Sequence, residues 1–185
     1  MKPILIALIV SLSCGVAAAG STSLATGQEM PKPQKEHEWL QQIVGEWDSA
    51  TEITMEPGKP PVKTKGSESV RAIGGFWILS ETKGEIPGGM PFTGLLSLGY
   101  SAEKKRYIGT WIDSVGSHLW TYTGTRDASG KVLTLETEGP TPDGKTGKFR
   151  EVLTITDKDH KSFSSSMEKD GQWVTFLKAE YTRKK

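Results

Sequence analysis

The chain has 185 residues, and its 23 Lys and Arg against 22 Asp and Glu give a formal net charge of only +1. Binding to nucleic acid depends on basic residues that neutralise phosphates, so this balance gives no case for nucleic-acid binding, and we expect no nucleic-acid partner. The length is that of a single domain, which buries well over half of the surface that its unfolded chain exposes.

The first nineteen residues have the pattern of a secretion signal. Lys2 provides the positive start, residues 4–12 form an apolar run too short to span a bilayer, and Ala17-Ala18-Ala19 is a small-residue cleavage site. Removing this segment would leave 22 basic and 22 acidic residues. We therefore predict a signal peptide at 1–19 and a secreted or periplasmic protein.

The chain has a single cysteine, Cys14, which lies within this signal. If cleavage follows Ala19, the mature protein has no disulfide and no thiol nucleophile. The alternative is a lipid anchor on Cys14, because Ser11 to Gly15 resembles a lipobox, although Ser11 stands where that motif has an aliphatic residue. Membrane association is expected only in that case. Residues 20–32 are rich in Ser, Thr, Gly and Pro and predict a flexible linker before one domain at 33–185.

Residues 33–44 are predicted to form one short helix. Pro33 suits a first helical turn, and Gly45 suits the end of the helix. Four apolar residues recur at helical spacing and form one stripe: Trp39, Leu40, Ile43 and Val44. We expect this helix to act as a lid or plug on the structure that follows.

After residue 45 the chain indicates an all-β domain. Turn signals such as Gly74-Gly75 and Asp170-Gly171 recur every 10 to 15 residues or so and separate ten candidate strands. The absence of long crossovers predicts an up-and-down antiparallel meander, and closure into a barrel would remove its exposed edges. Ten strands should also leave an internal cavity. The predicted strands are 47–56, 62–73, 76–83, 92–100, 106–113, 118–124, 132–138, 146–156, 162–168 and 173–182.

The three central strands, 92–100, 106–113 and 118–124, allow a register to be predicted. A loop at 114–117 would pair Asp113 with His118, Trp111 with Trp120, Gly109 with Tyr122, and Tyr107 with Gly124. A turn between Ala102 and Glu103 would pair Leu98 with Tyr107, Leu96 with Gly109, and Gly94 with Trp111. Glycine then meets an aromatic residue three times, and a ring can cover the bare backbone opposite it. The face predicted to point inward carries Phe92, Leu96, Leu98, Tyr107, Trp111, Trp120 and Tyr122.

Two features resemble the calycins, the superfamily of lipocalins and fatty-acid-binding proteins. Gly45-Glu46-Trp47 is a G-x-W motif at the start of the first strand, and Arg183 ends the last strand. The resemblance implies that Trp47 packs across the closed end of a barrel under Arg183.

Several runs resemble a family of secreted bacterial proteins that is number 1579 in the domain-of-unknown-function series. They include Gly74-Gly75-Phe76-Trp77, residues 105–114, Glu138-Gly139-Pro140 and Tyr181-Thr182-Arg183. This resemblance covers nearly the whole mature chain and implies a calycin-like barrel, but it implies no activity.

Asp113 and His118 form the sharpest candidate for chemistry. If they face each other, the carboxylate would orient the imidazole at the polar end of an apolar pocket made by Tyr107, Trp111, Trp120 and Tyr122. The same pair could instead be a salt bridge that closes the hairpin. A haem on His118 is a further alternative, because nitrobindin-type barrels of this superfamily carry one, but no C-x-x-C-H motif supports it. Three scattered histidines show no zinc-ligand spacing.

Six charged residues fall within predicted strands, and we expect most of them to point outward, because unpaired charges inside a barrel are costly. Arg150 and Glu81 are the expected exceptions. Alternation is poor between Val132 and Glu168, so the inward face of those strands stays open. The six residues are Glu68, Glu81, Glu136, Glu138, Arg150 and Glu151.

Three functions remain in view. The first is a binding module that holds a small, mostly apolar molecule against the aromatic face. The second is an enzyme that uses the same cavity, with His118 as general base oriented by Asp113. The third is a structural barrel without a ligand. The sequence leaves the ligand, any cofactor and the oligomeric state open.

Overall fold

The computed structural model describes residues 30–56 and 58–185, and within them Pro33–Lys185 forms one compact unit. The predicted signal peptide, Cys14 and most of the predicted linker lie outside the described residues.

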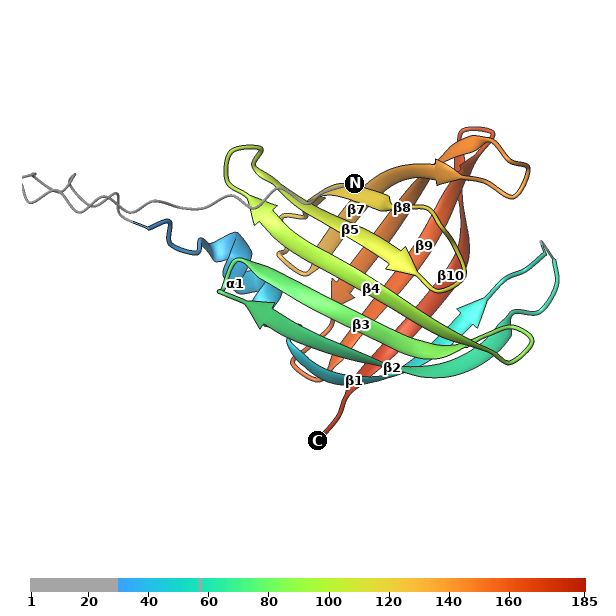
Figure 1. Cartoon of the computed structure of the whole chain (residues 1–185), viewed down its shortest axis with the longest axis horizontal. Helices are drawn as coiled ribbons and strands as arrows, with labels where there is room; N and C mark the ends of the chain where they lie inside the picture. The colour runs from blue at the N-terminus through green and yellow to red at the C-terminus, as the bar shows by residue number, and fades with distance from the viewer. Residues whose placement is uncertain (1–29, 57) are drawn as a thin grey trace, which may run out of the picture. The chain divides into compact units, whose positions relative to one another are not determined.

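Ten antiparallel strands form a closed barrel in which each strand pairs with the next along the chain and β10 pairs with β1 (Figure 1). Closure leaves no strand with an unpaired edge along its whole length, which is the physical advantage of a barrel over an open sheet. The predicted ten-stranded, up-and-down antiparallel barrel with one preceding helix is confirmed. The strands are β1 (Gly45–Ile53), β2 (Val62–Ile73), β3 (Trp77–Ile86), β4 (Met90–Ser101), β5 (Arg106–Asp113), β6 (Trp120–Arg126), β7 (Val132–Pro140), β8 (Thr146–Ile155), β9 (His160–Lys169) and β10 (Gln172–Arg183).

Helix α1 (Lys35–Gln41) is shorter than the predicted segment 33–44. Gln34 caps its first turn, and the backbone N–H groups of residues 42–44 each donate to the carbonyl three residues earlier, which tightens the chain before β1. Trp39, Leu40 and Ile43 are buried in the core at one end of the barrel, so α1 closes that end as predicted (Figure 1). No helix in the described part of the chain is long and apolar enough to cross a membrane.

The register between β5 and β6 is confirmed for Trp111 with Trp120, Gly109 with Tyr122, and Tyr107 with Gly124. The register between β4 and β5 differs by two residues from the prediction, because Leu96 pairs with Trp111 and Leu98 with Gly109. The cause is the turn, which spans residues 102–105 and places Lys105 at φ 52°. A shift by two residues preserves the face of every side chain.

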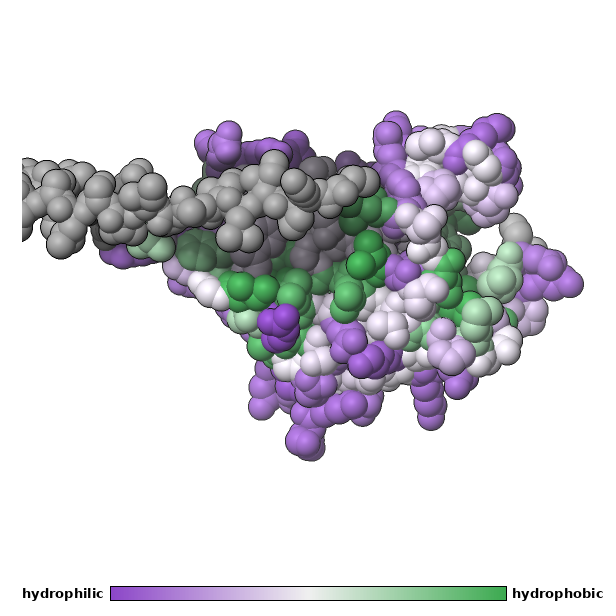
Figure 2. All heavy atoms as spheres, in the orientation of Figure 1, coloured by the Kyte–Doolittle hydropathy of each residue, from purple (hydrophilic) through white to green (hydrophobic). Residues whose placement is uncertain are grey.

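The aromatic face of the central strands points into the barrel, as predicted. Leu98 and Tyr107 are almost completely buried, whereas Leu95 and Ile112 on the opposite face are about half exposed. Figure 2 shows hydrophobic side chains gathered on the outer face formed by β3, β4 and β5.

Candidate functional site

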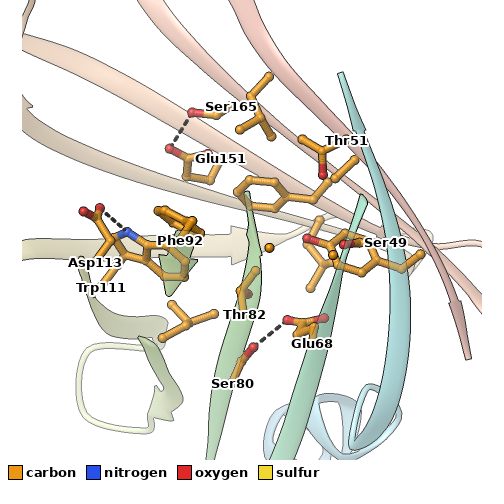
Figure 3. Close-up of a pocket in the computed structure, with 18 of the residues that line it drawn as sticks. Ser49, Thr51, Glu68, Ser80, Thr82, Phe92, Trp111, Asp113, Glu151 and Ser165 are labelled. Atoms are coloured by element: carbon orange, nitrogen blue, oxygen red, sulfur yellow. Dashed lines mark hydrogen bonds between the residues drawn. The ribbon is translucent and has the colours of Figure 1, made fainter. Parts of the chain in front are cut away.

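The barrel encloses a cavity with a volume of about 370 Å³, to which all ten strands contribute side chains. It extends from Ile43, behind α1, to a rim at the opposite end that includes Ile53, Glu85 and Asp113. The barrel interior is therefore not filled by its own side chains, in contrast to the expectation for a purely structural barrel. Figure 3 shows Thr51 and Thr82 among the residues that face this space.

Aromatic rings line the end of the cavity away from α1. The rings of Phe92 and Trp111 are stacked with centroids 6.2 Å apart, and those of Trp120 and Phe149 meet edge to face at 5.0 Å. A Cβ at Gly94 would collide with the Trp111 ring, and one at Gly139 would collide with the Trp120 ring. The glycines therefore give both indoles room to lie flat against the wall. This arrangement offers a ligand broad apolar surfaces.

Four of the six predicted ligand-binding residues line the cavity: Trp111, Asp113, Trp120 and Tyr122. Tyr107 is buried but lies towards α1, where its hydroxyl donates to the Glu36 carbonyl at 3.1 Å and its ring meets Trp39. Burial raises the pKa of Tyr107 to about 12. Tyr107 is thus part of the packing beneath the helix and not of the cavity wall.

The predicted Asp113–His118 pair is wrong. The pairing of β5 with β6 ends at Trp111 and Trp120, because the connecting loop spans residues 114–119 instead of 114–117. Asp113 instead accepts hydrogen bonds from the Trp111 indole N–H and the Val115 backbone N–H, both at 3.0 Å. His118 is exposed and meets the Trp120 ring edge to face at 4.8 Å. An imidazole base oriented by Asp113 therefore has no basis in this geometry.

A buried ion pair lies at the end of the cavity near α1. The Lys161 ammonium donates to Glu68 Oε2. Ser80 Oγ donates to Glu68 Oε1 at 2.6 Å (Figure 3). The Lys161 nitrogen also lies 4.7 Å from the ring centres of both Trp47 and Tyr181. Burial lowers the pKa of Lys161, and the Glu68 carboxylate opposes this effect. The charges of both groups are compensated inside the barrel.

Arg183 packs on the outer side of the same end of the barrel, the end that α1 closes. Its guanidinium lies 4.0 Å from the centre of the Trp47 ring and donates to the carbonyls of Gln42, Val44 and Lys158, each at 2.7 Å. A side chain at Gly45 would strike this guanidinium, and its φ of +136° also favours glycine. Gly45, Trp47 and Arg183 thus lie together where the G-x-W resemblance places them.

Glu151 is a second buried carboxyl group in the cavity wall, and no cation of the described residues forms an ion pair with it. Glu151 is only 7% exposed, and its Oε1 accepts a hydrogen bond from Ser165 Oγ at 2.9 Å (Figure 3). Its Oε2 has no hydrogen-bond partner among the described residues. Burial raises the pKa of Glu151 to about 7, although the Ser165 hydroxyl favours the ionised form.

The sequence did not identify Glu68, Glu151 and Lys161 as cavity residues, and its two expected exceptions were wrong. Arg150 is paired with Glu136 at 3.1 Å and lies over the Trp173 ring, while Glu81 is paired with Lys83. Neither Arg150 nor Glu81 lines the cavity. The available signal was the alternation of Phe149, Glu151 and Leu153, which places the carboxyl group on an apolar face.

The residues present do not fit a haem bound through His118. His118 is exposed in the loop after β5, and no histidine in the described part of the chain lines the cavity. Among the described residues, no group of three or more His, Cys, Asp or Glu could hold a metal ion.

The chain is similar to several solved structures and matches one protein family. Rv2717c from M. tuberculosis matches with a TM-score of 0.62 and 18% identity, over 83% of this chain and 100% of that chain. The S-type phycobiliprotein lyase CPES from Guillardia theta matches with a TM-score of 0.54 and 16% identity, over 83% of this chain and 99% of that chain. At these identities the likeness shows the fold alone. No curated protein matches the chain. The family described as "Protein of unknown function (DUF1579)" matches residues 32–183, and the chain therefore belongs to that family.

Proposed function

We propose that this protein binds a small, mostly apolar molecule inside the barrel. The observation that carries the proposal is the cavity of about 370 Å³, whose wall is largely apolar and whose one end is closed by α1. Small-molecule sites have volumes of roughly 300–1,000 Å³ and combine apolar walls with a few polar groups. This cavity has both properties.

The aromatic end is the expected contact surface for the apolar part of the ligand. Trp111 is held in place by its stack with Phe92 and by its hydrogen bond to Asp113, so it loses little freedom when a ligand packs against it. Trp120 is held by Phe149 in the same way. Preorganised rings of this kind favour binding over collapse of the cavity.

The test uses Nile red, a neutral apolar dye whose fluorescence rises in apolar surroundings. We expect the wild-type protein to bind it and Trp111→Ala to bind it at least about tenfold more weakly, because a large apolar contact is removed. Trp77→Ala is the matched control, since it removes a tryptophan of the same size that lies on the outer face over Gly99. Equal affinity in a folded Trp111→Ala variant would contradict the assignment of the pocket.

We also propose that the protein is exported and that cleavage after Ala19 precedes binding. The support is the positive start, short apolar run and small-residue site within residues 1–19. The intact mass of the protein from its native host distinguishes a chain that begins at Gly20 from one that begins at a lipidated Cys14. The same native-mass spectrum would reveal a bound molecule.

A further inference from the structure

Glu151 is a buried carboxyl group of the cavity wall, and one of its two oxygens, Oε2, lacks a hydrogen-bond partner among the described residues. It lies on β8, directly opposite Ser165 of β9 and Leu135 of β7, and its inward-facing neighbours along β8 are Phe149 and Leu153. The Ser165 hydroxyl donates a hydrogen bond to Oε1 of Glu151, and Oε2 has no donor within the described residues. A carboxyl group buried to this extent is expected to have its hydrogen-bonding capacity met.

The charged and titratable groups that face Glu151 do not supply a cation. Lys161 on β9 is the buried cation of the cavity, and Glu68 on β2 already neutralises it. On β6, Tyr122 is kept neutral by burial, as is Tyr181 on β10, and both have a raised pKa. Glu85 on β3 and Asp113 on β5 add two further carboxyl groups at the rim. Lys65 on β2 and Lys83 on β3 also line the cavity, but both residues are exposed.

The interior therefore favours a ligand that brings its own positive charge. An ammonium group next to Glu151 would supply both the missing hydrogen-bond donor and the missing countercharge, in surroundings of low dielectric where each is worth more than in water. A carboxylate ligand would instead face Glu151 and Asp113 with the same sign of charge. The raised pKa of Glu151 agrees with the lack of a cation in the protein itself.

We propose that the cavity selects amphiphilic amines, whose protonated amino group donates to Oε2 of Glu151 while an apolar body packs between Phe149, Leu153 and the indoles of Trp111 and Trp120. This inference rests on the proposed binding function and specifies the chemical class of the ligand. No bond is made or broken in the process.

The experiment compares three probes of equal chain length, decylamine, 1-decanol and decanoate, by their displacement of Nile red from the full mature protein. An alkylamine, like a Lys side chain with a pKa of about 10.4, stays protonated between pH 5.5 and 8. We expect decylamine to bind about tenfold more tightly at pH 8 than at pH 5.5, because only ionised Glu151 pairs with it. The affinity for 1-decanol should not change with pH, and decanoate should bind more weakly than decylamine at pH 8.

Glu151→Gln keeps the shape of the side chain and an acceptor for Ser165 but has no charge. In this variant decylamine should bind about tenfold more weakly at pH 8 and lose its pH dependence, while 1-decanol should bind as before. Glu138→Gln makes the same change at an exposed position of β7 and should behave as the wild type. If Glu151→Gln fails to fold, the pH series and the three probes on the wild-type protein still decide the question.

The possible results separate the two proposals. Equal binding of decylamine and 1-decanol, with no effect of pH or of Glu151→Gln, would overturn the amine inference and leave the binding function in place. Tighter binding of decanoate would overturn it as well. Failure of Nile red and of all three probes to bind would overturn the binding function and the inference with it.

Discussion

Two carboxyl groups among the described residues, Glu68 and Glu151, are buried in the barrel interior, and their surroundings differ. Glu68 has Lys161 and Ser80 as partners, whereas Glu151 has only the Ser165 hydroxyl. A buried carboxylate without a cation is costly, so Glu151 keeps its proton to a higher pH, with a pKa of about 7 against an ordinary 4.5. This difference affects stability as well as binding.

Stability should fall as the pH rises through the range in which Glu151 titrates. Between pH 4.5 and 7 the folded protein holds a proton that the unfolded chain has lost, so the free energy of unfolding decreases by about 3 kcal/mol over this interval. Glu151→Gln should remove this contribution. Between pH 5 and pH 8 the free energy of unfolding of the wild type should therefore fall by about 2–3 kcal/mol more than that of the variant. Urea denaturation at the two pH values measures it.

Glu138→Gln serves as the control for this measurement, because Glu138 is exposed and its loss should leave the pH dependence of stability unchanged. Parallel pH dependences for the wild type and Glu151→Gln would show that Glu151 is not a buried, cation-free carboxyl group.

At the level of elements, α1 is held by packing and not by its own propensity. Seven residues are too few for a stable isolated helix in water. Leu40 is completely buried against the barrel, and the Trp39 indole N–H donates to the Gly130 carbonyl at 2.6 Å. The helix thus gains its order from the barrel end that it closes.

Leu40→Ala should therefore lower the free energy of unfolding by about 2–5 kcal/mol, the usual cost of a cavity left by a buried leucine. Glu38 lies on the exposed side of the same helix, so Glu38→Ala should change the free energy of unfolding by no more than about 0.5 kcal/mol. Urea denaturation curves compare the two. Similar small effects would mean that α1 does not close the barrel in solution.

At the level of the whole molecule, closure of β10 on β1 brings distant parts of the chain together. Lys161 and Glu68 are 93 residues apart in sequence. They meet because β10 and β1 lie between β9 and β2, so that the lysine passes Tyr181 and Trp47 to reach the carboxylate. Arg183 joins the same end of the barrel from outside.

Deletion of residues 172–185 removes β10 and should abolish cooperative folding, because β1 and β9 then expose unpaired edges and Arg183 is lost. We expect aggregated protein in gel filtration and no cooperative thermal transition by circular dichroism. Deletion of residues 184–185 removes only the Lys184 hydrogen bond to Glu46 and its exposed ion pair with Asp48, and it should leave the barrel intact. A cooperative, monomeric barrel after the longer deletion would contradict this view.

The amino-acid sequence by itself determined the helix, the ten strands and the inward aromatic face. Alternation with period two and the spacing of turn residues are local properties, so they can be read without tertiary contacts. Trp111, Trp120 and Tyr122 were placed correctly for this reason. The loops were predicted less accurately. The β4–β5 register differs from the prediction by two residues, which changes no face, and Asp113 and His118 are not paired, because the loop between β5 and β6 is longer than predicted.

Only the tertiary structure decided which charges lie inside. In the sequence, Glu68 falls in a predicted strand and Lys161 in a predicted turn, and both look solvated. The alternation of Phe149, Glu151 and Leu153 places Glu151 on an apolar face but does not show whether that face points inward. Closure of the barrel pairs Glu68 with Lys161 and leaves Glu151 without a cation. The physical reason is that burial and countercharge depend on side chains from strands far apart in the chain, which come together only in the folded barrel.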